Sequence, residues 1–119
     1  NCEFGLRLLY SPDGQEQTRI VYQSALRQIS IEREQSSTNP NVDRENCSVV
    51  LEPAAGDILT LHIFLDHSVL EVFVNGCCYL ASRIYPEYHD SLGLELFSRK
   101  GSVKVRSLDI WQLASIWKL

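Results

Sequence analysis

Several features that mark common protein classes are missing from this chain of 119 residues. It contains no methionine and begins Asn-Cys-Glu-Phe, so we expect a fragment from the interior of a longer chain. No stretch approaches the roughly 18 uninterrupted apolar residues of a membrane span. None combines the basic, apolar and small-residue parts of a signal peptide. We therefore expect no membrane partner, while secretion and a cytoplasmic location both stay open.

Basic residues are also sparse and scattered. Eleven Lys and Arg against fifteen Asp and Glu give a formal net charge of -4. The densest basic stretch is Arg99-Lys100, followed by Lys104 and Arg106. A nucleic-acid partner usually requires a basic face that displaces counterions from the phosphates. The composition therefore argues against a nucleic-acid partner.

Cofactor-binding patterns are missing as well. The cysteines include no Cys-x-x-Cys pair, and the three histidines (His62, His67 and His89) lack the spacing of a metal pair. There is no glycine-rich phosphate loop and no Gly-x-Ser-x-Gly nucleophile elbow. The sequence therefore predicts no metal, no cofactor and no serine-hydrolase chemistry, and we expect the histidines to be structural.

The four cysteines allow two arrangements. Cys77 and Cys78 are adjacent, so on a strand their side chains would leave opposite faces. A disulfide from one of them to Cys2 or Cys47 is the first arrangement. Buried free thiols are the second, and the general burial preference of cysteine favours it.

The chain does contain a succession of short β-type patterns separated by turn residues. Residues 26–32 alternate apolar and polar side chains, which is typical of a strand with one buried face. Ser11-Pro12-Asp13-Gly14 is a turn signal, and Asn75-Gly76 is a stronger one because both central positions of a type I′ turn require positive φ. The expected strands are residues 4–10, 17–23, 26–32, 47–52, 58–65, 69–74, 77–85, 92–98 and 103–113.

Three of the segments differ from this simple pattern. Residues 58–65 and 69–74 carry apolar side chains on both faces, which predicts central strands of one hairpin that are covered on both sides. Residues 33–46 are instead polar and rich in turn residues. We expect them to form a long exposed loop, the place where disorder is most favoured.

These patterns predict the fold class. At least eight short strands occur, and the only candidate helix is residues 112–119. Strands of unequal length and one long loop favour two packed sheets over a uniform barrel. We expect residues 1–119 to form a single all-β domain, a two-sheet antiparallel β-sandwich of the jelly-roll or concanavalin-like kind.

Two carboxylates are the best candidates for chemistry. Asp66 precedes the apolar segment 69–74, and Glu71 lies inside it. Two acids roughly 5–9 Å apart suffice for glycoside hydrolysis, but any acidic domain has such pairs on its surface. A buried Glu71 would need a positive partner, and Arg83 on the next expected strand is well placed. We therefore expect an ion pair rather than catalysis.

Four aromatic residues could form a platform on which a sugar ring stacks: Tyr85, Tyr88, Trp111 and Trp117. Packing in the core or against a neighbouring domain is the alternative that we favour, because tryptophan contributes a large buried area. The tail around the two tryptophans is too apolar to lie free in water, so we expect it to pack on this domain or on a neighbour.

Three segments together resemble the C-terminal part of glycoside hydrolase family 32, the invertases and fructanases. Residues 64–76 (FLDHSVLEVFVNG) resemble that family's Asp-x-Ser-x-x-Glu-x-Phe-x-Asn segment, and residues 82–86 (SRIYP) resemble its Ser/Thr-Arg-x-Tyr-Pro segment. Residues 108–117 are similar to its tryptophan-containing C-terminus. Residues 4–6 and 11–14 resemble the sequences of its earlier strands. The resemblance thus spans nearly the whole chain.

The resemblance implies an activity whose catalytic residues this chain lacks. Family members hydrolyse or transfer β-fructofuranosyl groups of sucrose, inulin or levan, with an active site in an N-terminal five-bladed propeller. That site uses Asn-Asp-Pro, Arg-Asp-Pro and Glu-Cys segments, and none occurs here, so no catalytic residue is carried over. The implied C-terminal domain is a sandwich of two sheets. Cys2-Glu3-Phe4-Gly5 matches an interior point of that domain, so we expect its first strand to be missing and a sheet edge to be open to a partner chain.

We therefore expect a non-catalytic accessory sandwich whose partner is the propeller domain of the same polypeptide. The residues expected to matter are structural: Asp66, Ser68, Asn75 and Gly76 in the hairpins, Glu71 and Arg83 as a pair, Pro86 at a strand end, and Trp111 and Trp117 in packing. One alternative is an independent lectin-like module that binds fructan or sucrose through residues that the sequence does not identify. Another is a homo-oligomerisation domain that uses the apolar tail or an unpaired edge strand.

Overall fold

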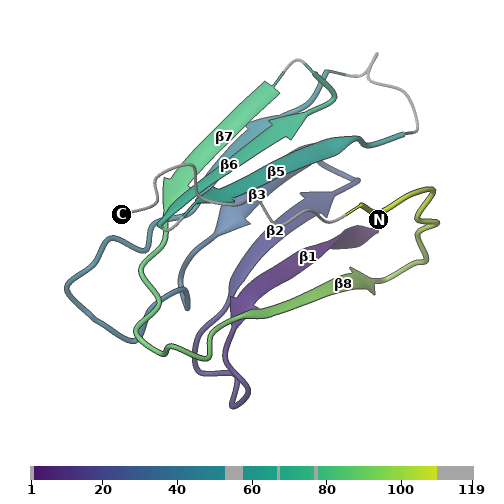
Figure 1. Cartoon of the computed structure of the whole chain (residues 1–119). Helices are drawn as coiled ribbons and strands as arrows, with labels where there is room; N and C mark the ends of the chain where they lie inside the picture. Colours follow the sequence, from purple (N-terminus) through teal and green to yellow (C-terminus); the bar gives the residue numbers. More distant parts are fainter. Residues whose placement is uncertain (1, 53–57, 67, 77, 110–119) are drawn as a thin grey trace.

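The computed structural model describes residues 2–52, 58–66, 68–76 and 78–109. These residues form eight strands (Figure 1): β1 (Glu3–Tyr10), β2 (Thr18–Gln23), β3 (Gln28–Glu32), β4 (Cys47–Val50), β5 (Leu61–Asp66), β6 (Val69–Val74), β7 (Cys78–Arg83) and β8 (Gly93–Arg99). Among the described residues no helix is long and apolar enough to cross a membrane.

The strands form two antiparallel sheets. The five-stranded sheet has the order β4-β3-β2-β1-β8, and the three-stranded sheet has the order β5-β6-β7. Every pairing in both sheets is antiparallel. The all-β, two-sheet fold class that the alternating patterns predict is therefore confirmed.

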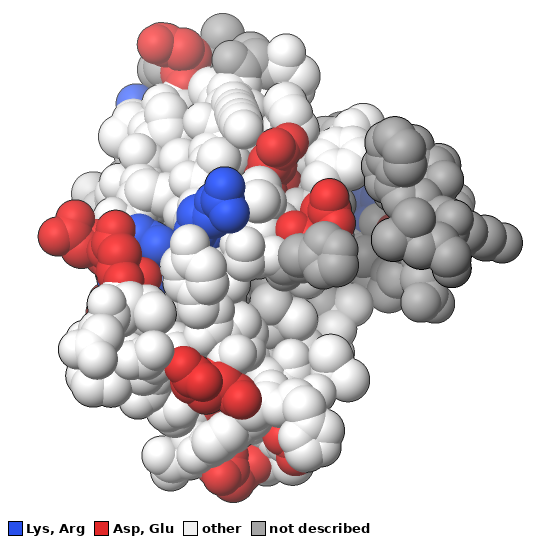
Figure 2. Space-filling view, turned by 60° about the vertical axis from the view of Figure 1, so that its left-hand side comes forward, with Lys and Arg blue, Asp and Glu red and all other residues white. Residues whose placement is uncertain are grey.

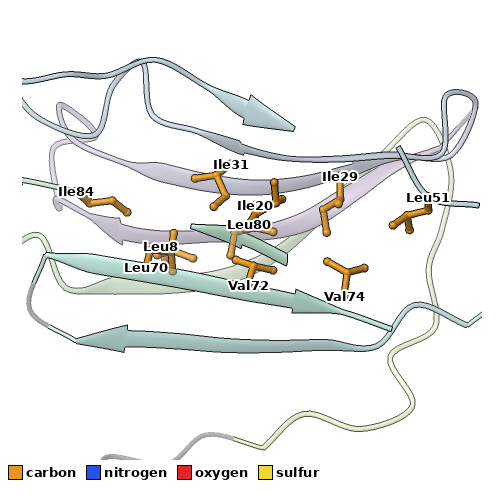
Figure 3. Packing of buried hydrophobic residues seen from close by; sticks show 10 residues of the cluster. All are labelled: Leu8, Ile20, Ile29, Ile31, Leu51, Leu70, Val72, Val74, Leu80 and Ile84. Atoms are coloured by element: carbon orange, nitrogen blue, oxygen red, sulfur yellow. The ribbon is translucent and has the colours of Figure 1, made fainter. Parts of the chain in front are cut away.

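The hydrophobic core lies between the two sheets, as Figure 3 shows. Alternate side chains of each strand point into this space, because successive residues of a strand face opposite sides of a sheet. Each large aliphatic side chain removed from water contributes roughly 1.5–3 kcal/mol, so this cluster is the main source of stability. Its buried members are Leu8, Ile20, Ile29, Ile31, Leu51, Leu70, Val72, Val74, Leu80 and Ile84.

The β5–β6 hairpin forms as predicted, but its environment differs from the prediction. Leu70 and Val72 of β6 are fully buried on the side that faces the five-stranded sheet. On the opposite side, Phe64 and Phe73 are exposed, and β5 lies at the edge of its sheet. The expectation of central strands covered on both sides is therefore wrong for the described residues, since apolar composition does not show what lies above a sheet.

The region after β8 also differs from the prediction. Residues 103–109 are exposed and form no strand, although we expected one over residues 103–113. A strand obtains its backbone hydrogen bonds from a neighbouring strand, so alternation alone does not place it. Residues 110–113, the candidate helix 112–119 and both tryptophans, Trp111 and Trp117, lie outside the described residues.

The long loop of residues 33–46 is anchored at its start by Arg33. The buried Arg33 side chain donates from Nε to the Glu45 carbonyl (2.6 Å) and from Nη1 to the Arg83 carbonyl (2.8 Å). Its backbone N–H donates to Asn46 Oδ1 (2.8 Å). The bond to the Arg83 carbonyl joins the loop to the end of β7, so the start of the loop lies beside the three-stranded sheet.

Candidate functional site

The two segments that resemble family motifs, residues 64–76 and 82–86, place residues at both ends of the three-stranded sheet. Asn75 and Gly76, between β6 and β7, have φ values of 53° and 70°, the positive values that we predicted from their sequence. Asn75 also forms two hydrogen bonds with Thr60: its backbone N–H donates to the Thr60 carbonyl, and its Oδ1 accepts from the Thr60 N–H, both at 2.8 Å. These bonds continue the β5–β6 pairing beyond the start of β5.

The opposite end of the sheet joins Ser68 to the end of β7. The Ile84 N–H donates to the Ser68 carbonyl (2.7 Å), and Arg83 Nη1 donates to Ser68 Oγ (3.4 Å). Asp66 pairs in register with Val69, whereas β7 ends at Arg83, before the half-buried Pro86. His67, which lies in this connection, is outside the described residues.

The predicted ion pair between Glu71 and Arg83 does not form. Glu71 lies opposite Phe64 on one side and Ala81 on the other, and it is only half-buried. The physical reason for the pair was full burial of the carboxylate, and that burial is not present. The ion pairs between described residues are Arg7–Glu95, Arg19–Glu32, Arg33–Asp43 and Arg99–Glu3.

The side of the three-stranded sheet that points away from the core, which we call the outer face, brings many of these residues together. Strand register places His62, Phe73 and Tyr79 in one row across the sheet. A second row holds Phe64, Glu71 and Ala81, and a third holds Asp66, Val69 and Arg83. The outer face therefore combines aromatic rings with single charged groups.

Three aromatic rings form a connected cluster on the outer face. The rings of Phe64 and Phe73 meet edge to face with centroids 5.8 Å apart, and those of Phe73 and Tyr79 lie 4.9 Å apart. These side chains are 49%, 38% and 47% exposed for Phe64, Phe73 and Tyr79. A solvated outer face of an antiparallel sheet normally carries polar residues, so this cluster marks a candidate contact surface.

A shallow hollow of about 420 Å³ adjoins the end of the outer face. Its polar groups include the buried Arg33, the exposed Asp43 and Arg83, and Tyr85, whose ring is 40% exposed. Arg33 is already held by backbone carbonyls and by Asp43 (3.4 Å), so its guanidinium is less available to a ligand than that of the exposed Arg83. The other expected platform member, Tyr88, lines a separate hollow of about 380 Å³ with His89 and Asp90.

The charged surface is mixed. On the face that Figure 2 shows, acidic and basic side chains are scattered, with uncharged surface between them. Within the described part of the chain, no group of three or more His, Cys, Asp or Glu residues could hold a metal ion. Cys2 and Cys47 carry free, half-buried thiols, Cys78 is half-buried, and Cys47 Sγ lies 3.3 Å from Ser82 Oγ.

Sequence reasoning missed the most constrained carboxylate in the structure, that of Glu16. This side chain is fully buried and accepts hydrogen bonds from the backbone N–H groups of Thr38 (2.7 Å), Glu87 (2.8 Å) and Tyr88 (2.9 Å). Ser91 Oγ donates to it as well (2.8 Å). The carboxylate thus joins the β1–β2 loop, the loop after β3 and the segment after β7.

The environment of Glu16 favours its charged form. Burial acts to raise its pKa, but the hydrogen bonds from Glu87, Tyr88, Thr38 and Ser91 outweigh burial and hold the pKa below its ordinary value. No local signal indicates this role, because Glu16 stands between Gln15 and Gln17 in a polar loop. Its partners lie 22 to 75 residues away in the sequence.

Comparison with known proteins identifies this sandwich. The family model for the C-terminal domain of glycosyl hydrolases family 32 matches residues 1–112. A levanase of Bacillus subtilis is 32% identical over 98% of this chain, and an extracellular exo-inulinase of Aspergillus awamori is 32% identical over 96% of it. The chain spans only 17% and 22% of those two proteins.

Solved structures agree with the sequence match. The crystal structure of the exo-inulinase from Aspergillus awamori superposes with a TM-score of 0.74 and 29% identity, covering 83% of this chain and 20% of that chain. A β-fructofuranosidase of Aspergillus kawachii superposes with a TM-score of 0.70 and 26% identity, covering 82% of this chain and 18% of that chain. The chain therefore belongs to the family of C-terminal β-sandwich domains of glycosyl hydrolases family 32.

Proposed function

We propose that this chain is a non-catalytic accessory sandwich of an enzyme that hydrolyses β-fructofuranosyl bonds in sucrose or fructans. Its partner in this proposal is a five-bladed propeller domain earlier in the same polypeptide, which performs the chemistry. The family match supports the first part, because the similar proteins include levanases, an inulinase and invertases. The short span of the chain within those proteins leaves room for a much larger catalytic part.

The geometry of Glu16 is the observation that supports a structural role for the one fully buried acid of the described residues. A glycosidase needs an accessible acid with a raised pKa beside a second carboxylate. Glu16 is the fully buried acid of the described residues, yet its pKa is lowered and both oxygens accept hydrogen bonds from the protein itself. Its carboxylate is therefore committed to holding three loops together and is not available to a substrate.

The experiment is a direct activity comparison. The chain of 119 residues and the complete protein encoded by its gene are each incubated with sucrose, inulin and levan, and released fructose is measured. We expect hydrolysis by the complete protein alone. Hydrolysis by the isolated chain, or no action of the complete protein on any fructoside, would contradict the proposal.

A second candidate function, fructan binding by the sandwich itself, is favoured by the hollow beside Tyr85. An exposed ring next to Arg83 and Asp43 offers one stacking surface together with a donor and an acceptor for sugar hydroxyls. Calorimetric titration of the chain with inulin tests this function. Binding that Tyr85→Ala abolishes would support it, and the absence of heat up to millimolar sugar would remove it.

A further inference from the structure

We infer that the free edge of β8 is a homodimer interface, at which two copies of the chain join their five-stranded sheets through antiparallel β8 strands. The inference goes beyond the proposed function, because neither an activity nor a catalytic partner enters it. Three observations support it together: an edge strand with a single neighbour, leucines exposed on the core side of that strand, and charges on β8 that complement those of a second β8.

The position of β8 leaves its outer edge open. It is the last strand of the five-stranded sheet, next to β1 (Figure 1), and among the described strands it contacts β1 alone. The backbone N–H and C=O groups along the outer side of an edge strand have no strand partner, so they can pair with another chain. A second copy that adds its own β8 would satisfy these groups as β1 does on the inner side.

Two leucines of β8 are exposed on the side of the sheet that faces the core. Leu94 lies opposite the buried Leu8 of β1, and therefore points to the same side of the sheet. Leu96 lies opposite Leu6, which packs against the core. Leu94 and Leu96 are nevertheless 46% and 45% exposed, because the three-stranded sheet does not contact β8. A second copy beside β8 would continue this apolar surface and remove part of it from water.

The opposite side of β8 carries charges of both signs. Glu95 forms an ion pair with Arg7 (2.9 Å), and Arg99 forms one with Glu3 (3.6 Å), both across the β1–β8 pair. The Glu95 and Arg99 side chains remain 45% and 60% exposed, so each can bind a second partner. Among the four edge strands that the structure describes, β8 alone combines an acidic residue with an arginine.

A two-fold axis through Phe97 makes these charges complementary between two copies. In antiparallel pairing about that residue, Glu95 of each copy lies opposite Arg99 of the other, and the two Phe97 rings lie opposite each other. The signs of the charges then alternate across both sheets in the order Arg7, Glu95, Arg99 of the second copy and Glu3 of the second copy. Opposite charges and aromatic rings at directly opposed positions both stabilise a strand pair.

The other edge strands are less suited to pairing with a second copy of themselves. β5 carries Asp66 but no lysine or arginine, and β4 carries no charged residue, so neither strand brings opposite charges together. On β7, the carbonyls of Ala81 and Arg83 already accept from Cys47 Sγ (3.9 Å) and Arg33 Nη1 (2.8 Å). The observations therefore favour β8 as the edge that a second copy extends.

Sedimentation velocity of the complete protein encoded by the gene tests the inference. An edge-to-edge interface is small, so we expect a reversible equilibrium in which the dimer fraction rises with protein concentration through the micromolar range. Leu96→Thr should weaken association about tenfold, because it removes apolar surface from both sides of the interface. Val50→Thr is the matched control on β4, at the other edge of the same sheet, where Val50 is 61% exposed, and it should leave association unchanged. A protein that stays monomeric at every concentration would overturn the inference, and so would equal effects of the two variants.

An exchange of charges separates pairing between copies from stability within one copy. Glu95→Arg and Arg99→Glu each place like charges opposite each other in the dimer, so each should raise the dissociation constant about tenfold. The double variant restores an opposite pair between the copies, but it still places like charges beside Arg7 and Glu3 within each copy.

The double variant therefore gives the decisive comparison. We expect it to associate nearly as well as the unchanged protein, although its midpoint of thermal unfolding should be the lowest of the four proteins, because the two internal repulsions add. If association merely followed the stability of each copy, the double variant would be the weakest dimer. A double variant that associates as weakly as either single variant, or more weakly, would contradict the β8 interface.

Discussion

Replacing Glu16 with alanine is the perturbation that the structure predicts most sharply. Glu16→Ala removes the acceptor for the backbone N–H groups of Thr38, Glu87 and Tyr88 and for the hydroxyl of Ser91. The hydroxyl can turn to another partner, whereas the three N–H groups are fixed by the backbone. The variant therefore leaves these partly buried donors without a protein acceptor, and water can replace it only where water reaches the vacated space.

The expected cost follows from these bonds. A hydrogen bond to a charged group contributes about 1.5–3 kcal/mol, and an unsatisfied buried donor costs about 1–3 kcal/mol. Water that enters the space replaces part of this loss, so we expect the free energy of unfolding to fall by about 3–5 kcal/mol. For a domain whose total stability is about 5–15 kcal/mol, that change is a large fraction.

Urea unfolding followed by circular dichroism measures this change in the free energy of unfolding. Glu45→Ala is the matched control, because the Glu45 side chain is exposed and its contact with Arg33 uses the backbone carbonyl. We expect the control to change stability by less than about 0.5 kcal/mol. A loss below 1 kcal/mol for Glu16→Ala, on the order of the control, would refute the idea that this carboxylate holds the loops together.

The lowered pKa of Glu16 gives the same residue a pH signature. A carboxyl whose pKa is lower in the folded protein than in the unfolded chain stabilises the fold fully above its unfolded pKa, and that stability is lost as the pH falls toward the folded pKa. We therefore expect stability to decrease as the pH falls below the ordinary value of 4.5. In Glu16→Gln, this part of the pH dependence should disappear in urea titrations, and an unchanged pH dependence would contradict the assignment.

Three further substitutions test the fold at single positions. A Cβ added at Gly5 would collide with the Ile20 carbonyl oxygen on β2, so Gly5→Ala should lower stability by more than about 2 kcal/mol, measured by urea unfolding. Asn75→Ala removes the acceptor of the Thr60 N–H and places alanine at positive φ, so thermal melting should report a loss of about 1–2 kcal/mol, with Asn75→Gly recovering part of it. Ile29→Ala empties part of the core and should cost about 2–5 kcal/mol, whereas Ile29→Val should cost about 0.5–1.5 kcal/mol in the same assay.

Local sequence determined the elements of this protein well. The alternation of residues 26–32 places Ile29 and Ile31 in the core, and both are fully buried. Asn75-Gly76 specifies a turn, since few residue pairs tolerate two successive positive φ values. Period and turn chemistry act over a few neighbouring residues, so the sequence expresses them directly. The motif resemblance to family 32 has the same origin, because it lies mostly within the β5–β6–β7 hairpins.

Tertiary structure alone decided which polar residues have partners. Glu71 in an apolar strand indicated a buried ion pair, but the outer face leaves it half-buried opposite Phe64 and Ala81. Glu16 in a polar loop indicated nothing, yet it is fully buried and accepts hydrogen bonds from the backbone N–H groups of two distant segments. Such partners come from loops that meet only after both sheets have formed. Burial and pairing therefore depend on long-range packing, whereas strand period and turn type depend on the backbone conformations that neighbouring residues allow.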